Sequence, residues 1–122
     1  QLTESASEAE TASAEDKHTQ WAESVRQYIE ENYQNSSLNA SMVADHLQIS
    51  LSTLSRRYKN AAGHGVLDEI HLTRLQNAKR LLQSGKTVRE TAEQTGYIES
   101  RAMIRAFKRY EGMTPGQYAG KE

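Results

Sequence analysis

One segment, residues 87–115, constrains the fold of this 122-residue chain more than any other. Val88, Thr91 and Ala92 give a short helix one inward face. Gly96 follows, where a helix can end because glycine takes a positive φ without a Cβ clash. A second apolar face then repeats at the i, i+3, i+4, i+7 spacing of a helix: Met103, Ala106, Phe107 and Tyr110. The segment is therefore predicted to form two helices joined by a tight turn.

The polar face of the second predicted helix is basic, and Gly112 and Pro115 mark its end. Its basic side chains are Arg101, Arg105, Lys108 and Arg109. A bracing helix, a turn and an amphipathic basic helix make up a helix-turn-helix, in which the second helix enters the DNA major groove. We therefore predict a helix-turn-helix here, followed by a last short helix after Pro115. We call the second helix of such a motif its recognition helix.

The same pattern occurs earlier in the chain at a nearly fixed offset. Ala44 precedes a turn as Ala92 does, 48 residues later. An offset of 49 residues then relates Arg56 to Arg105, Tyr58 to Phe107, Lys59 to Lys108 and Gly63 to Gly112. One extra residue in the second turn accounts for the difference. The repeat predicts a first helix-turn-helix upstream of the one described above.

A long helix is predicted between the two repeats, over residues 66–83. Its apolar residues recur at helical spacing: Leu67, Ile70, Leu75, Ala78, Leu81 and Leu82. Eighteen residues make a rod of about 27 Å. Two recognition helices on one face of B-DNA should lie about 34 Å apart to enter successive major-groove segments. The rod therefore suits a chain that binds DNA as a monomer.

Three further helices complete an all-α prediction of about seven helices, and no stretch shows the alternation of a strand. One begins near Thr19, with an apolar stripe that includes Trp21. Another covers residues 40–47 behind an Asn39 N-cap. The third follows Ser50, with Leu51, Leu54 and Tyr58 on its buried side. The predicted organisation is a first helix-turn-helix subdomain over 20–65, the linker helix over 66–83 and a second subdomain over 84–122.

Residues 1–19 are predicted to be a disordered acidic linker or tail. Residues 1–16 contain almost no large apolar side chain, so they cannot bury enough surface to offset the entropy of ordering. A helix is a weaker alternative, because Ala and Glu favour one. The chain begins with Gln1, so it is expected to be processed or, more simply, cut from a longer protein.

The formal net charge is −1, which is unusual for a protein that binds nucleic acid. Five acidic residues and one basic residue lie in residues 1–20, so the other 102 residues carry 14 basic and 11 acidic side chains. DNA affinity depends on local basic clusters rather than on the charge of the whole chain. The charge distribution is therefore compatible with a duplex as partner.

Other classes of function receive no support from the sequence. The chain has no cysteine, and none of its four histidines pair at i, i+4, so no metal site is expected. No residue is marked as a nucleophile and no phosphate-binding loop is present, so we expect neither an enzyme nor a cofactor. No apolar run approaches the ~18 residues of a membrane span, and we expect no membrane contact.

Residues 21–120 resemble the DNA-binding domain of the AraC/XylS family of bacterial transcription regulators. The resemblance rests on LSRRYK at 54–59, on Arg74 with Ala78, Leu81 and Leu82, on Ala92 with Gly96, and most specifically on FKRYEGMTPGQY at 107–118. It implies sequence-specific binding of double-stranded DNA and regulation of transcription in the cytoplasm. It also implies a sensory or receiver domain N-terminal to this chain, with RNA polymerase as a further candidate partner.

The resemblance also implies which residues contact DNA. Base contacts correspond by position to Ser52, Thr53, Ser55 and Arg56 in the first motif, and to Ser100, Arg101, Ala102, Ile104 and Arg105 in the second. Phosphate contacts are expected at Ser50, Arg57, Lys59, Thr87, Lys108 and Arg109. Arg56 and Arg105 are the strongest candidates, because a guanidinium can bind guanine O6 and N7 together. Tyr58 and Phe107 are expected in the cores, and Trp21 is expected to pack against the first motif.

Some positions depart from the usual family pattern. Ile104 stands where a small polar residue is common, Ala102 is short, and Leu51 is apolar near the start of a recognition helix. Such side chains can contact a thymine methyl group, or the motif reads fewer bases. Gln48 replaces a turn glycine, which costs little if the turn is not left-handed.

A helical protein-interaction module without DNA binding is the alternative function. In that case the basic helix faces are only solvated. Affinity for duplex DNA that falls steeply with salt separates the two hypotheses.

Overall fold

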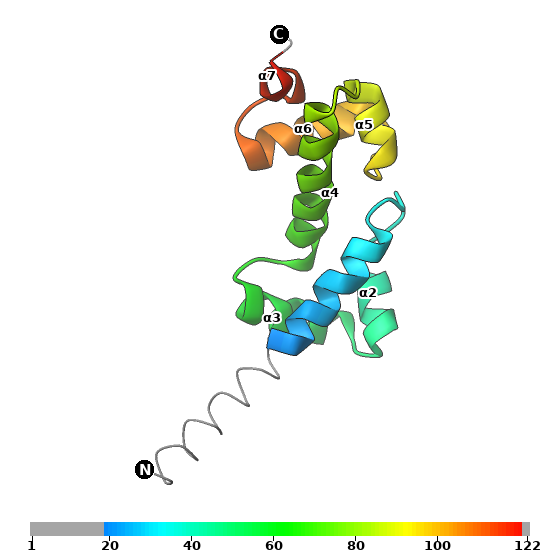
Figure 1. Cartoon of the computed structure of the whole chain (residues 1–122). Coiled ribbons are helices and arrows are strands. Elements are labelled where there is room, and N and C mark those ends of the chain that lie inside the picture. Colours follow the sequence, from blue (N-terminus) through cyan, green and yellow to red (C-terminus); the bar gives the residue numbers. More distant parts are fainter. Residues whose placement is uncertain (1–18, 121–122) are drawn as a thin grey trace, which may run out of the picture.

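The computed structural model describes residues 19–120, which form seven helices and no strand (Figure 1). The first helix is described over residues 19–32. The others are α2 Ala40–Leu47, α3 Leu51–Ala62, α4 Val66–Gln83, α5 Val88–Gln94, α6 Ser100–Glu111 and α7 Pro115–Ala119. The all-α prediction with two helix-turn-helix units is confirmed. The predicted tail lies outside the described residues except for residue 19, which is helical. No helix within 19–120 combines the length and the apolarity that crossing a membrane requires.

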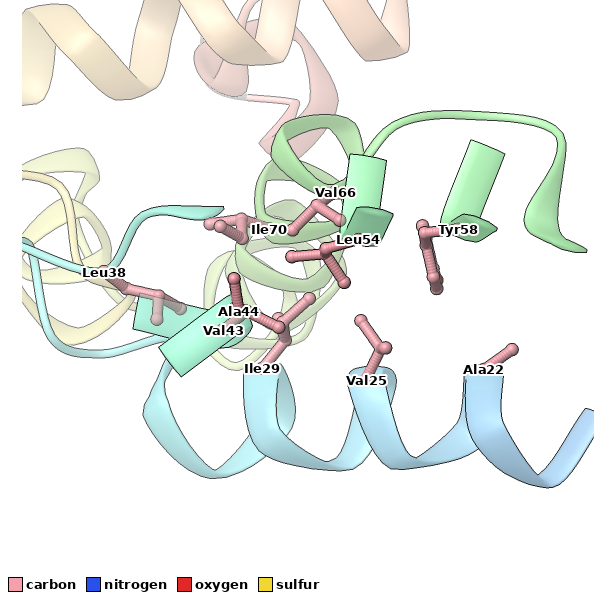
Figure 2. Packing of buried hydrophobic residues seen from close by; sticks show 10 residues of the cluster. All are labelled: Ala22, Val25, Ile29, Leu38, Val43, Ala44, Leu54, Tyr58, Val66 and Ile70. Atoms are coloured by element: carbon pink, nitrogen blue, oxygen red, sulfur yellow. The ribbon is translucent and has the colours of Figure 1, made fainter. Parts of the chain in front are cut away.

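Two separate hydrophobic cores lie at the two ends of α4. The first joins the 19–32 helix, α2 and α3, and contains Val25, Ile29, Leu54 and Tyr58 (Figure 2). The second joins α5 and α6, with α7 packed against it; its largest fully buried side chain is Phe107. Tyr58 and Phe107 are both fully buried, so their predicted core positions are confirmed.

The long helix α4 belongs to both cores and is more than a connector. Its Val66 and Ile70 are part of the first core, whereas its Leu75, Ala78 and Leu82 are part of the second. Its bounds agree with the predicted linker helix over 66–83. Each half of α4 packs with a different helix-turn-helix, so α4 is not a separate linker between two units. The division into subdomains over 20–65, 66–83 and 84–122 therefore stays a prediction.

Local side-chain hydrogen bonds explain where the short helices begin. Asn39 and Ser50 accept hydrogen bonds from backbone N–H groups in the first turns of α2 and α3, which confirms the N-cap predicted at Asn39. Thr87 and Glu90 form a reciprocal capping box at the start of α5. These caps satisfy N–H groups that have no partner inside the helix.

Two leucines predicted to face inward are exposed instead. Leu51 is 45% exposed and Leu67 is 59% exposed. Both lie in the first turn of a helix, where the apolar stripe extends past the end of the core. In α4, Val66 takes the core position next to Leu67 and is only 4% exposed.

The turn of the first motif is left-handed at Gln48, with φ 59° and ψ 41°. From the sequence, Gln48 in place of glycine is expected to lose little stability only in a turn that is not left-handed. That condition is not met. Gln48 is the only non-glycine residue with a positive φ in the described part of the chain. Its side chain is exposed, so the cost is confined to backbone conformation.

The turn of the second motif is packed against the first subdomain. Gly96 has a φ of +93°, and a Cβ added there would lie 2.1 Å from the Tyr33 carbonyl oxygen and 2.9 Å from Arg74 Nε. Glycine is therefore required here by two independent constraints, the positive φ and the close approach of a neighbouring backbone.

We predict that Gly96→Ala destabilises the fold far more than Gly63→Ala. Gly63 also has a positive φ, but a Cβ there would have no atom within 4 Å. Gly63→Ala should therefore lose only the roughly 1–2 kcal/mol of left-handed strain, whereas Gly96→Ala must also move the Tyr33 backbone. Urea unfolding of both variants measures the difference. Equal losses would show that the approach to Tyr33 does not constrain residue 96.

Candidate nucleic-acid interface

The two recognition helices, α3 and α6, bury equivalent faces. α3 packs on α2 and α6 packs on α5. Leu54 and Tyr58 of α3 and Met103 and Phe107 of α6 are fully buried. The buried faces leave the opposite, basic faces of both helices toward solvent, as the repeat predicted.

The predicted contact residues divide into exposed and half-buried groups. The exposed ones are Ser50, Ser52, Ser55, Arg56, Arg57, Lys59, Thr87, Arg101, Arg105, Lys108 and Arg109. The half-buried ones are Thr53, Ser100, Ala102 and Ile104. Ala102 packs against the second core, which limits how much of it a base can reach. Each recognition helix thus presents arginine side chains to solvent.

Several of the predicted contact residues have partners inside the domain, and Ser50 and Arg57 are two examples. The Ser50 hydroxyl accepts a hydrogen bond from Thr53 N at 3.1 Å and donates one to Thr53 Oγ1 at 2.8 Å. The Arg57 guanidinium lies 4.1 Å above the Trp21 ring, a cation–π arrangement. Trp21 also contacts Tyr58 with 6.3 Å between ring centroids, which confirms that it packs against the first motif.

A surface groove separates the start of α4 from α6. Its lining includes Leu67, Asp68, Arg105 and Arg109. The Tyr110 hydroxyl donates a hydrogen bond to Asp68 Oδ1 at 2.7 Å. This hydrogen bond lowers the pKa of Asp68, while burial and the same bond raise the pKa of Tyr110. A fixed carboxylate therefore lies beside the basic face of α6.

His71 lies in the same region between two tyrosine rings. Its Nδ1 and the Tyr97 hydroxyl are 2.9 Å apart, and its ring is 5.5 Å from that of Tyr110. Burial lowers the pKa of His71, and the positive charges of Arg74 and Arg109 lower it further against the opposing effect of Asp68. These effects favour the uncharged form of His71 in the folded state.

We predict that His71 makes the fold sensitive to acid. Its pKa is lower in the folded state than the roughly 6.5 of an unfolded chain, so the unfolded state binds the proton more readily. Its contribution to stability is present above about pH 6.5 and is lost as the pH falls below that value. The stability difference between wild type and His71→Gln should therefore shrink between pH 7.5 and 5.5 in urea unfolding. A constant difference would show that folding does not shift the pKa of His71.

His64 and His71 have different partners. His64 Nε2 lies 2.7 Å from Glu69 Oε1, whereas His71 Nδ1 lies 2.9 Å from the Tyr97 hydroxyl. Within residues 19–120 no group of three or more His, Cys, Asp or Glu side chains has an arrangement that holds a metal ion.

The residue that sequence reasoning missed is Arg74, which was quoted only as part of the family pattern. It is 6% exposed and lies on the buried stripe of α4 with Ile70, Ala78 and Leu82. The sequence did contain a signal for its importance, because Arg74 is a charged residue at the i, i+4 spacing of an apolar stripe. A charge buried on such a stripe needs specific partners. Those partners come from the loop after the first helix and are invisible in local sequence.

Comparison with known proteins places this geometry in a family. A family model described as a helix-turn-helix domain matches residues 43–121. The C-terminal domain of AraT, a response regulator from Geobacillus stearothermophilus, is 31% identical with a TM-score of 0.78, and the match covers 83% of this chain and 84% of that one. The chain belongs to the AraC-type helix-turn-helix family. It is a DNA-binding domain of a transcription regulator and not an enzyme.

Two further relatives extend the comparison. A Streptomyces lividans protein described as an AraC-like transcription regulator is 39% identical over 77 residues, which are 62% of this chain and 25% of that protein. The DNA-binding domain of AdpA, crystallised with a target DNA, has the same fold at 24% identity and a TM-score of 0.74, covering 81% of this chain and 89% of that one. This AraC-type chain spans well under half of the Streptomyces relative.

Proposed function

We propose that this domain binds double-stranded DNA sequence-specifically as a monomeric unit, with α3 and α6 in successive segments of the major groove. The observation that carries the proposal is the equivalence of the two motifs. Arg56 and Arg105 occupy corresponding positions 49 residues apart, and both are exposed on helices whose other faces are buried. A monomer then presents two similar basic surfaces, as a dimer of single motifs does.

Base recognition is assigned to the exposed side chains near the start and middle of each recognition helix. Arg56 and Arg105 would each bind a guanine, with Arg101 and the nearby serines Ser52 and Ser55 adding contacts. The half-buried residues Thr53, Ser100, Ala102 and Ile104 would contribute smaller apolar or polar contacts. Leu51 is exposed enough to contact a thymine methyl group.

Phosphate contacts are assigned to the flanking basic residues Arg57, Lys59, Lys108 and Arg109. The backbone N–H groups at the start of α3, beside Ser50, are suited to a phosphate, and we assign a similar role to Thr87 at the start of α5. The cation–π contact with Trp21 holds the Arg57 guanidinium in place while its side chain stays exposed. Such contacts fix the position of the protein on the duplex without selecting sequence.

The wider setting follows from the relatives. AraT is named a response regulator, and the AdpA domain was crystallised with DNA. We therefore propose that this domain is the DNA-binding part of a longer cytoplasmic regulator. A sensory or receiver domain would precede it, and RNA polymerase is its candidate protein partner.

The first test is fluorescence anisotropy of wild type with a random-sequence duplex across a salt series. We expect affinity to fall steeply with salt, because several phosphates lose counterions on binding. Bound sequences selected from a random library should then share two half-sites. Absence of duplex binding at low salt would instead favour the protein-interaction module, with the basic faces only solvated.

The second test separates the two motifs. Arg56→Ala and Arg105→Ala should each lose about 1–3 kcal/mol on the selected duplex, and each should relax selectivity at one half-site only. Arg80→Ala is the control, because Arg80 is exposed on α4, shares its surface pocket with Glu30 and belongs to neither recognition helix. Equal losses in all three variants would show that only overall charge matters.

A further inference from the structure

Arg74 lies between the two hydrophobic cores, and backbone carbonyl groups accept its hydrogen bonds. It is 6% exposed, in the middle of α4. Its Nε donates a hydrogen bond to the Tyr33 carbonyl at 2.9 Å, and its Nη2 donates one to the Asn35 carbonyl at 2.9 Å. Its guanidinium carbon lies 5.4 Å from the centre of the Tyr97 ring. One side chain thus connects α4, the loop after the first helix and the turn of the second motif.

Other contacts across the same junction connect the same two segments. The Gln34 side chain donates a hydrogen bond to the Gln94 carbonyl at 3.0 Å. Gly96 allows its own backbone to approach the Tyr33 carbonyl oxygen, as described above. Residues 33–35 of the first subdomain are therefore held against residues 94–97 of the second. We call this contact, together with Arg74, the interdomain junction.

The interdomain junction constrains a motion that α4 alone would permit. α3 packs with the N-terminal half of α4, and α6 packs around its C-terminal half. Bending or twisting α4 between Ile70 and Leu75 would turn one recognition helix relative to the other. Such a motion would break both hydrogen bonds of Arg74 and leave a buried guanidinium without these partners, which is costly.

We propose that Arg74 is a positioning residue that sets the half-site spacing this domain accepts on DNA. The inference rests on the proposed function. By holding residues 33–35 against the turn of the second motif, Arg74 fixes the separation and relative rotation of α3 and α6. Adding one base pair between half-sites rotates one of them by roughly 35° about the duplex axis. A rigid pair of motifs cannot follow that rotation, whereas a flexible pair can.

The chemistry of the contact requires arginine. Tyr33 and Asn35 present two separate carbonyl oxygens, and the planar guanidinium offers two donors in a fixed fork to bind both at once. A lysine ammonium is a single point donor and cannot reproduce the fork. A lysine at position 74, in Arg74→Lys, should therefore not hold the interdomain junction as arginine does. Arg74→Met removes both hydrogen bonds and keeps much of the packing of the side chain.

The DNA experiment uses the duplex selected by wild type and variants of it with one or two base pairs added or removed between the half-sites. Wild type should bind the selected spacing best and lose affinity at every other spacing. Arg74→Met and Arg74→Lys should lose about tenfold or more at the selected spacing, because the two half-sites no longer act together. Their dependence on spacing should become flat, while binding to a duplex with one half-site stays close to wild type.

A structural measurement without DNA completes the test. The chain contains no cysteine, so single cysteines at the exposed positions Asn60 and Lys86 can carry spin labels on the two subdomains. The distance distribution should be narrow in the otherwise wild-type chain and broad in Arg74→Met and Arg74→Lys. Arg80→Met, on the exposed side of the same helix, is the matched control and should leave the distribution narrow.

The outcomes separate the proposal from the proposed function. A narrow distribution and unchanged spacing dependence in either folded Arg74 variant would overturn the role of Arg74. If Arg74→Met does not fold, Arg74→Lys and Gln34→Ala, which removes the bond to Gln94, decide the question by the same two measurements. If wild type binds no duplex, the proposed function fails, and the role of Arg74 as a spacing determinant fails with it. The spin-label distances would still show whether Arg74 couples the subdomains.

Discussion

The structure depends on one helix being shared by two small cores. A stripe along α4 runs from Ile70 through Arg74 and Ala78 to Leu82, and its two ends lie in different cores. Each subdomain has only a few large buried side chains, so neither end of α4 would be well covered without its own helix-turn-helix. The only charged residue on this stripe lies where the cores change over, and it is stabilised there by backbone carbonyls of Tyr33 and Asn35.

The two motifs repeat in sequence but differ in their surroundings, and their turns show the difference. The first turn reaches a left-handed conformation at Gln48, whose side chain is exposed. The second turn uses Gly96, because the backbone of Tyr33 occupies the space a Cβ would need. In the first turn the Gln48 side chain lies at the surface, whereas the second turn is part of the interdomain junction. One repeat therefore tolerates a side chain at its turn and the other does not.

The candidate interface depends both on contacts within each motif and on contacts between segments that are distant in sequence. The basic faces of α3 and α6 are exposed because Tyr58 and Phe107 anchor the opposite faces in the cores. Other features of the surface depend on contacts between distant segments. Trp21 from the first helix stacks on Arg57, and Asp68 from α4 accepts a hydrogen bond from Tyr110 of α6. The interface is therefore shaped by both cores as well as by its own helices.

The sequence by itself determined the helices, their caps and the two motifs, because helical spacing and capping by Asn39, Ser50 and Thr87 act within a few residues. It also indicated which arginines are exposed, since burial of the apolar face leaves the other face outward. The prediction from helical spacing that Leu51 and Leu67 are buried was wrong, because periodicity does not show where a core ends. Only the tertiary structure decided the partners of Arg74 and the packing against Gly96, since these contacts join residues about 40 to 60 positions apart.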